Sequence, residues 1–184
     1  CRPSSRPTPG CTASPSSTRR SSSTPVTGRV YFIVARSGDR EPRLQIGRTG
    51  TPFFGRDVEN LVPGQAAVID ASDLGTPVAS LKDLPPGDYV VQAFVNLYSE
   101  FRRADGHTVW MHDDQWEGQH WNASPGNLYS RPQTVRIDQA TERIRLSTDQ
   151  VIGPVIVPAE TAFVKRIKIQ SPLLTKFWGR PIYL

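Results

Sequence analysis

The chain has 184 residues, of which 37% are hydrophobic, and this is enough for one domain with its own core. Its net charge of +5 and pI near 9.6 would suit a nucleic-acid partner, but +4 of that charge comes from arginines in residues 1–27. Residues 28–184 carry only +1 and show no basic block, which argues against a nucleic-acid partner. No apolar run approaches the ~20 residues that span a bilayer, so no transmembrane span is expected.

Residues 1–27 are rich in Ser, Thr, Pro and Arg and hold almost nothing apolar to bury. They are predicted to be a disordered tail or linker, because ordering them would cost more entropy than their contacts return. Both cysteines, Cys1 and Cys11, lie in this tail. Since the chain begins at Cys1 without a methionine, we expect it to be processed or a fragment, and a lipid-modified N-terminal cysteine is one explanation.

The first strand is predicted at residues 28–36, a nearly continuous apolar run suited to a strand covered on both faces. Residues 51–58 place two adjacent aromatics on a segment bounded by Pro and Gly. A plug over the end of the core is favoured there over a ligand site. Residues 65–70 and 78–81 are predicted to be short strands or edge pieces.

The best-specified segment is residues 84–98, where a rigid Pro-Pro-Gly turn leads into a run of β-branched and aromatic residues. It is predicted to be a turn followed by a central strand. Leu84, Pro86, Gly87 and Tyr89 match the pattern of a tyrosine corner, in which the phenol hydroxyl bonds to backbone just upstream. The alternative is an ordinary hairpin turn.

Three more short strands are predicted at residues 134–137, 143–146 and 151–157. Short strands at regular spacing, together with 17 prolines that disfavour long helices, predict an all-β fold. The expected architecture is an immunoglobulin-like antiparallel β-sandwich over residues 28–160. Residues 161–184 contain an alternating strand at 164–169 and are expected to start a connection or strand into a downstream domain missing from this chain.

Residues 104–129 concentrate the chemistry of the chain and are expected to form a long loop between strands. They hold all three histidines, three of the four tryptophans and several acids: His107, His112, His120, Trp110, Trp116, Trp121, Asp105, Asp113, Asp114 and Glu117. Three tryptophans argue against disorder, so this loop is where a site must be sought.

One interpretation of the loop is a divalent metal site, because imidazoles and carboxylates are ligands of zinc and other transition metals. The candidate ligands are His107, His112, Asp113, Asp114 and His120. Asp113 and Asp114 with Glu117 could instead hold calcium through oxygens. The spacing matches no compact metal motif, so we expect no resident cofactor.

A second interpretation is a platform for a carbohydrate or another polar ligand, with Trp110, Trp116 and Trp121 stacking on it and Glu117 accepting hydrogen bonds. A third, which is favoured, is a structured loop whose tryptophans cover the sheet or a neighbouring domain. The chain has no Gly-x-Ser-x-Gly elbow, phosphate loop or dinucleotide fingerprint that would place a familiar catalytic site.

Several unusual segments of residues 28–184 resemble the N-terminal region of large bacterial exported esterases whose catalytic part is an esterase D-like α/β-hydrolase domain. They are PFFGRDV at 52–58, LPPGDY at 84–89, ADGHTVW at 104–110, DQWEGQ at 114–119, SPGNLY at 124–129, and residues 170–184. The resemblance implies that the hydrolase domain lies downstream, so no catalytic residue can be assigned to this chain. It also implies export to the periplasm, the cell surface or the medium. Residues 1–27, with Cys1 as the candidate lipid anchor, lie outside the resemblance.

The leading hypothesis is a non-catalytic accessory module that packs on or gates that downstream hydrolase domain. The first alternative is a module that binds a polysaccharide or another polar ligand through its tryptophans. The second is a metal-dependent hydrolase site on the histidine-rich loop. Whether the chain is itself an enzyme stays open.

Overall fold

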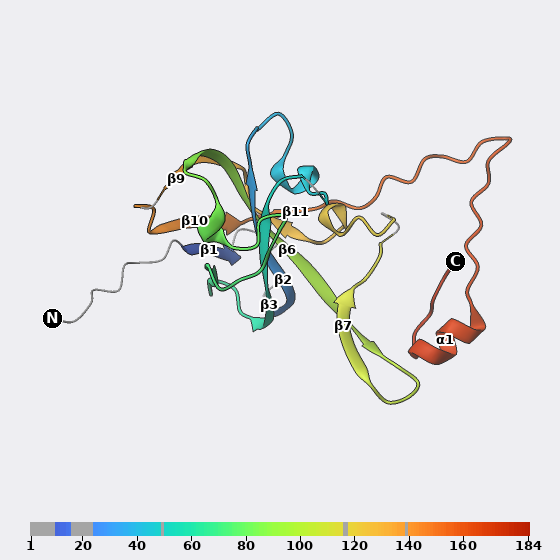
Figure 1. Cartoon of the computed structure of the whole chain (residues 1–184). Coiled ribbons are helices and arrows are strands. Elements are labelled where there is room, and N and C mark those ends of the chain that lie inside the picture. Colours follow the sequence, from blue (N-terminus) through green and yellow to red (C-terminus); the bar gives the residue numbers. More distant parts are fainter. Residues whose placement is uncertain (1–9, 16–23, 49, 116–117, 139) are drawn as a thin grey trace.

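The computed structural model describes residues 10–15, 24–48, 50–115, 118–138 and 140–184, and most of the regular structure in them is β-strand (Figure 1). The strands are β1 (Gly10–Pro15), β2 (Val26–Ala35), β3 (Phe53–Leu61), β4 (Ala67–Ile69), β5 (Gly75–Thr76), β6 (Gly87–Arg102), β7 (Thr108–His112), β8 (Leu128–Tyr129), β9 (Gln133–Ile137), β10 (Arg143–Thr148) and β11 (Gln150–Val151). The described residues also form the 3-10 turns η1 (Pro42–Gln45), η2 (Leu81–Asp83) and η3 (Trp121–Ala123), and the helix α1 (Pro172–Trp178). The predicted all-β class is confirmed.

In the described part of the chain the strands form two sheets, ordered β11-β8-β6-β2-β3-β5 and β10-β1-β4. β6 is the centre of the larger sheet: β2 pairs along one edge, and β9, β8 and β7 pair in turn along the other. The strand pairs are antiparallel except that of β1 with β10. The central strand predicted within residues 84–98 is therefore confirmed, and it continues to Arg102.

Side chains from both sheets bury one shared apolar cluster. It includes Phe32 of β2 and Val91 of β6 from the larger sheet, and Ile69 of β4 and Leu146 of β10 from the smaller. Because successive side chains of a strand point to opposite faces, the residues between these core positions in β2 and β6 face away from the cluster. That second face of the larger sheet carries the features described below.

The turn before β6 has the predicted hydrogen bond. The hydroxyl of Tyr89 donates to the carbonyl oxygen of Pro85 at 2.6 Å, and Tyr89 and Leu84 are both buried in the core. Pro86 remains exposed, and Gly87 opens β6. This bond ties the turn to the central strand at the point where the strand begins.

Replacing Tyr89 by phenylalanine is expected to lower the free energy of unfolding by about 1 kcal/mol, because the partly buried hydrogen bond to Pro85 is lost while the ring keeps its packing. Urea unfolding of the variant measures the change. Tyr98→Phe is the matched control, since the Tyr98 hydroxyl lies 3.4 Å from Asp57 in an exposed contact. Equal losses in the two variants would contradict the role assigned to the corner.

Several sequence expectations differ from the structure. Residues 1–27 were expected to be disordered throughout, whereas Gly10–Pro15 form β1 and β2 already begins at Val26. Phe53 and Phe54 lie in β3 rather than on a plugging loop, because they pair with β2 on one edge and β5 on the other. The long loop after β6 contains β7, which pairs back onto β6 as a hairpin.

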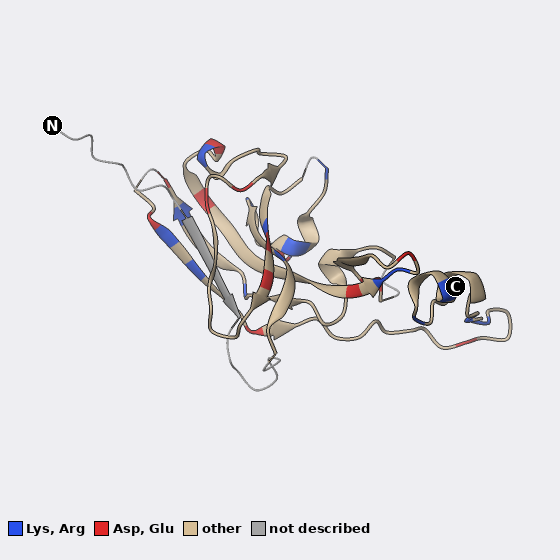
Figure 2. Ribbon diagram, turned by 90° about the horizontal axis from the view of Figure 1, so that it is seen from below, with Lys and Arg blue, Asp and Glu red and all other residues tan. Residues whose placement is uncertain are grey.

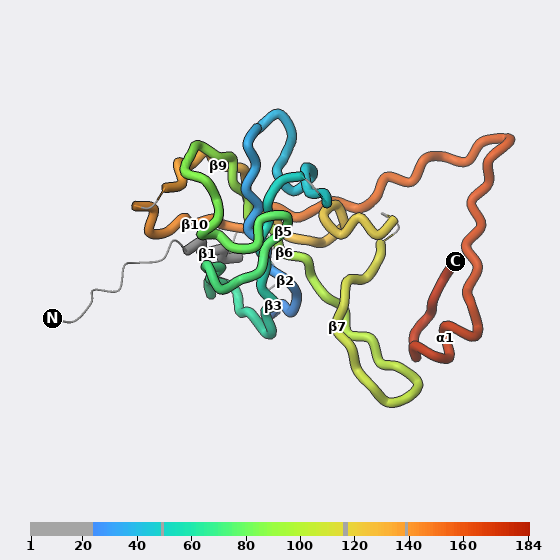
Figure 3. Tube along the Cα trace, in the orientation of Figure 1, coloured from blue at the N-terminus to red at the C-terminus, as the bar shows by residue number. Residues whose placement is uncertain are grey.

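The strand expected at residues 164–169 is absent from the described chain, where the segment pairs only at its end: Ile169 N donates to Leu184 O at 3.1 Å and Leu184 N donates to Ile169 O at 2.8 Å. Residues 153–169 instead run out as an arm, and the chain then returns to α1 (Figure 3). The helix has a clear local cause. The Ser171 side chain caps its N-terminus by accepting from Leu174 N, Pro172 fits its first turn, and Gly179 ends it with φ of 66°.

Candidate functional site

The side chains predicted as a single loop site are divided between two faces by the β6–β7 hairpin. Tyr98 pairs with His112 and Glu100 with Trp110, so these four side chains share one face. Phe101, whose cross-strand partner is Val109, faces the other way. Two cavities lie beside the hairpin, one lined by Tyr98 and Trp110 and the other by Phe101 and the end of β7.

The Trp110 groove is a cavity of about 310 Å³ between the hairpin and the ends of β2 and β3. Its main lining residues are Tyr98, Trp110, Asp57, Glu59, Asn60 and Thr27. Asp57 is held in place by Arg29, whose Nη1 lies 2.9 Å from its Oδ2. The groove therefore combines exposed aromatic surface with fixed polar atoms.

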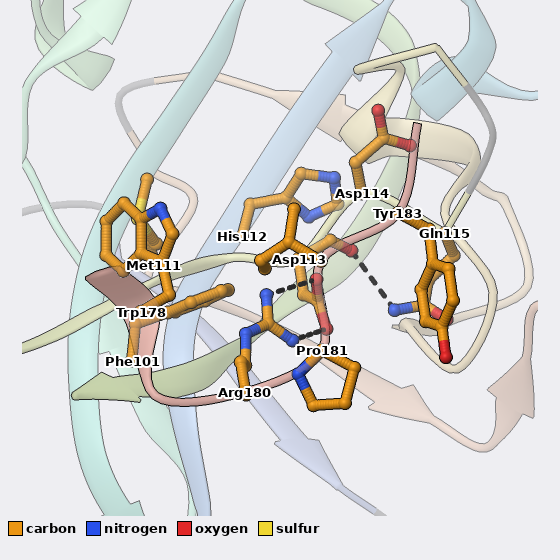
Figure 4. Close-up of a pocket in the computed structure, with 11 residues that line it drawn as sticks. Phe101, Met111, His112, Asp113, Asp114, Gln115, Trp178, Arg180, Pro181 and Tyr183 are labelled. Atoms are coloured by element: carbon orange, nitrogen blue, oxygen red, sulfur yellow. Dashed lines mark hydrogen bonds and ion pairs between the residues drawn. The ribbon is translucent and has the colours of Figure 1, made fainter. Parts of the chain in front are cut away.

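The hairpin cavity, of about 420 Å³, lies between the end of β7 and the C-terminal segment (Figure 4). Arg180 contacts both carboxylate oxygens of Asp113, at 3.2 and 3.4 Å, and its guanidinium lies 3.9 Å from the centre of the Phe101 ring. Trp178 packs edge-on against Phe101, with ring centres 5.6 Å apart. Asp113 thus joins the C-terminal segment to the hairpin, which leaves it less suited to a metal.

Trp121 belongs to an aromatic cluster on the second face of the larger sheet. Its ring stacks on Tyr31 at 4.6 Å and lies 5.6 Å from Phe94 and 6.2 Å from Phe53. Burial raises the pKa of Tyr31 to about 12, so its phenol stays neutral at physiological pH. Trp121 therefore covers the sheet, as the favoured interpretation of the loop expects.

Buried amides fasten the loop to this face. Asn127 accepts a hydrogen bond from Leu97 N at 2.8 Å, and its Nδ2 donates to Asn96 Oδ1 and Trp121 O at 3.1 and 2.8 Å. Gln92, which is fully buried, donates to Ser130 O at 2.8 Å. The sequence analysis did not select these residues. The signal was the presence of amides such as Gln92 and Asn96 within the otherwise apolar run of β6.

The histidines lie in three separate places. His107 is at the hairpin turn beside Asp105, with 3.3 Å between Nδ1 and Oδ1. His112 ends β7, and its Nδ1 lies 3.1 Å from Asn96 Oδ1. It follows His107 by five residues, which along an extended strand corresponds to about 17 Å. His120 is exposed just before η3.

No group of three or more His, Cys, Asp or Glu side chains that could hold a metal occurs within the residues the structure describes. The structure therefore does not bring the predicted metal ligands together. These ligands are His107, His112, Asp113, Asp114 and His120. Asp114 Oδ2 accepts from Gln119 at 2.9 Å. The other two predicted site residues, Trp116 and Glu117, lie outside the described residues.

Charges of both signs are interspersed along the described ribbon (Figure 2). Several form ion pairs, such as Arg56 with Asp73 at 2.8 Å and Arg43 with Glu41 at 2.6 Å. The exclusion of nucleic acid stays a prediction from charge. Among the described residues, no helix has both the length and the apolar character needed to cross a bilayer.

No family model, curated protein or solved structure matches the chain. The arrangement itself offers two kinds of contact. One is the Trp110 groove, and the other is the arm of residues 153–169 together with the C-terminal segment that closes the hairpin cavity.

Proposed function

We propose that the chain is a non-catalytic accessory module that packs on an esterase D-like α/β-hydrolase domain of the same polypeptide. The observation that carries the proposal is the exposed apolar surface of the arm formed by residues 153–169. Ile156 is 91% exposed, Phe163 98% and Ile167 75%. Exposed apolar side chains gathered on one segment favour a protein contact, and burying them returns about 25 cal/mol per Å².

The arm is held at both ends, which favours a docking role over a loose tail. At its start, Ile152 N donates to Asn127 O and Gly126 N donates to Ile152 O, both at 2.9 Å. At its end, Ala104 N donates to Phe177 O at 2.5 Å, and Arg180 pairs with Asp113. These anchors present the apolar side chains between them away from the sheets.

The finer features of the proposal have separate grounds. The immunoglobulin-like form of the β-fold is supported by the Tyr89 corner. Export rests on the likeness to exported esterases, and lipid attachment at Cys1 rests on the Ser/Thr/Pro-rich segment that follows this cysteine. The substrate class expected for the hydrolase domain is a carboxylic ester.

The first test is the reading frame that follows Leu184, where a strand-turn-helix carrying Gly-x-Ser-x-Gly is expected. Hydrogen exchange then compares the arm in this chain with the arm in the full polypeptide. Amides of residues 153–169 are expected to be protected at least tenfold more strongly in the full polypeptide. A frame without a hydrolase domain, or equal exchange in both forms, would remove the proposal.

A pair of variants assigns the contact to the arm. Phe163→Ser with Ile167→Ser is expected to abolish the added protection in the full polypeptide, because the apolar contacts are lost. Leu74→Ser is the control, since Leu74 is 78% exposed but lies outside the arm. Protection that survives the arm variant would place the docking surface elsewhere.

A further inference from the structure

The Trp110 groove has a flat aromatic floor that faces solvent. Trp110 is 48% exposed, and Tyr98 is its diagonal neighbour on the same face of the hairpin. The other two tryptophans with described positions behave differently: Trp121 stacks on Tyr31, and Trp178 packs on Phe101. No ring of the described residues stacks on Trp110, so its indole face is open to a ligand.

A β-bulge builds the polar wall of the groove. Val26 pairs with Leu61 and Gly28 with Val58, so β3 carries one extra residue over this stretch. Asn60 lies in the bulge with φ of 51°, and its N donates to Thr27 Oγ1 at 3.2 Å. Bulges redirect side chains and are common beside binding sites, and here Glu59 and Asn60 both line the groove.

Glycine allows this wall to approach the hairpin. A methyl group at Gly28 would overlap the carbonyl oxygen of Asn96 on β6, so only glycine permits β2 and β6 to lie this close. The bulge and Gly28 together set the wall beside Tyr98. The cavity is thus part of the rigid sheet rather than of a loop.

The charges in the groove discriminate between ligand classes. Asp57 and Glu59 would repel an anion. Asp57 is already paired with Arg29 at 2.9 Å, so one of the two carboxylates is neutralised before any ligand binds. A neutral polyol suits this lining, because its hydroxyls can donate to the carboxylates and exchange bonds with the Asn60 amide.

We propose that the Trp110 groove binds a neutral carbohydrate, with one sugar ring stacked on Trp110 and its hydroxyls bonded to Asp57, Glu59 and Asn60. A volume of about 310 Å³ is at the lower end for ligand cavities and suits a short stretch of glycan. None of the residues that line the groove belongs to the arm of residues 153–169. The two proposals can therefore fail independently.

Isothermal titration of the chain against soluble cello-, xylo-, manno- and N-acetylchito-oligosaccharides tests the proposal. At least one of these is expected to bind saturably, and Trp110→Ala is expected to weaken that binding about tenfold or more. Met111→Ala is the matched control: Met111 is the next residue, is 46% exposed and faces the opposite side of the hairpin. Its dissociation constant should stay within about twofold of the wild type.

Two further variants separate direct contact from damage to the fold. Trp110→Phe keeps an aromatic face and should bind more tightly than Trp110→Ala. Asn60→Gly keeps the left-handed backbone while removing the amide, and should weaken binding by a few-fold. Absence of saturable binding to the whole panel would overturn the proposal, as would equal losses in Trp110→Ala and Met111→Ala. Saturable binding of choline in place of the neutral sugars would overturn it as well.

Discussion

Replacing Trp121 by alanine is expected to lower the free energy of unfolding by about 3 kcal/mol. The indole stacks on Tyr31 and contacts Phe53 and Phe94, so its removal opens a cavity over the second face of the larger sheet. Aromatic pairs at these separations add to the loss beyond the area that is uncovered. Urea unfolding followed by circular dichroism measures the change without relying on tryptophan emission.

Trp110→Ala is the matched comparison for this prediction. Trp110 is half exposed and has no stacked ring among the described residues, so its loss should cost less than about 1 kcal/mol. The same two variants are expected to behave oppositely in sugar titrations, where Trp121→Ala keeps its affinity. Equal destabilisation by the two substitutions would show that the structural and ligand-facing roles have been assigned wrongly.

The sequence predicted the elements whose cause is local. The Pro-Pro-Gly turn, the apolar run after it and the Tyr89 corner are specified within fifteen residues, and all of them are present. The short strand at residues 65–70 also appears, as β4. Local rigidity and a period of two are sufficient to define such elements.

The site was harder to predict, because it depends on partners that are distant in the sequence. Trp110 and Trp121 lie eleven positions apart and look equivalent, yet Trp121 meets Tyr31 and Phe53 while Trp110 meets the bulge in β3. The β7 hairpin places Trp110 on one face, and the chain then turns back before Trp121. Neither outcome follows from composition.

The C-terminal helix was missed for another reason. The Ser171–Pro172 start and the Gly179 stop are recognisable helix boundaries, but the alternation just before them favoured a strand. A helix of seven residues has too few turns for an apolar period to stand out. Its docking by Arg180 and Trp178 on the hairpin supplies stability that the local sequence lacks.

Asn127→Ala is expected to destabilise the fold by about 2–3 kcal/mol, although it removes only one small side chain. Asn127 is 2% exposed and its side chain makes three hydrogen bonds, so alanine would remove the partner of Leu97 N and leave Trp121 O with its bond from Ser124 N at 3.3 Å. Buried polar groups that lose their partners carry most of the penalty. Thermal and urea unfolding of the variant both report it.

A double-mutant cycle identifies which of these bonds matters. Asn96→Ala combined with Asn127→Ala should show a coupling of about 1 kcal/mol, because Asn127 Nδ2 lies 3.1 Å from Asn96 Oδ1. Tyr89→Phe combined with Asn127→Ala should be additive, since Tyr89 lies at the far end of β6. Additivity in both cycles would mean that the amides act separately. Coupling only in the first would show that they join β6 to the η3 segment, and so keep Trp121 over the aromatic face.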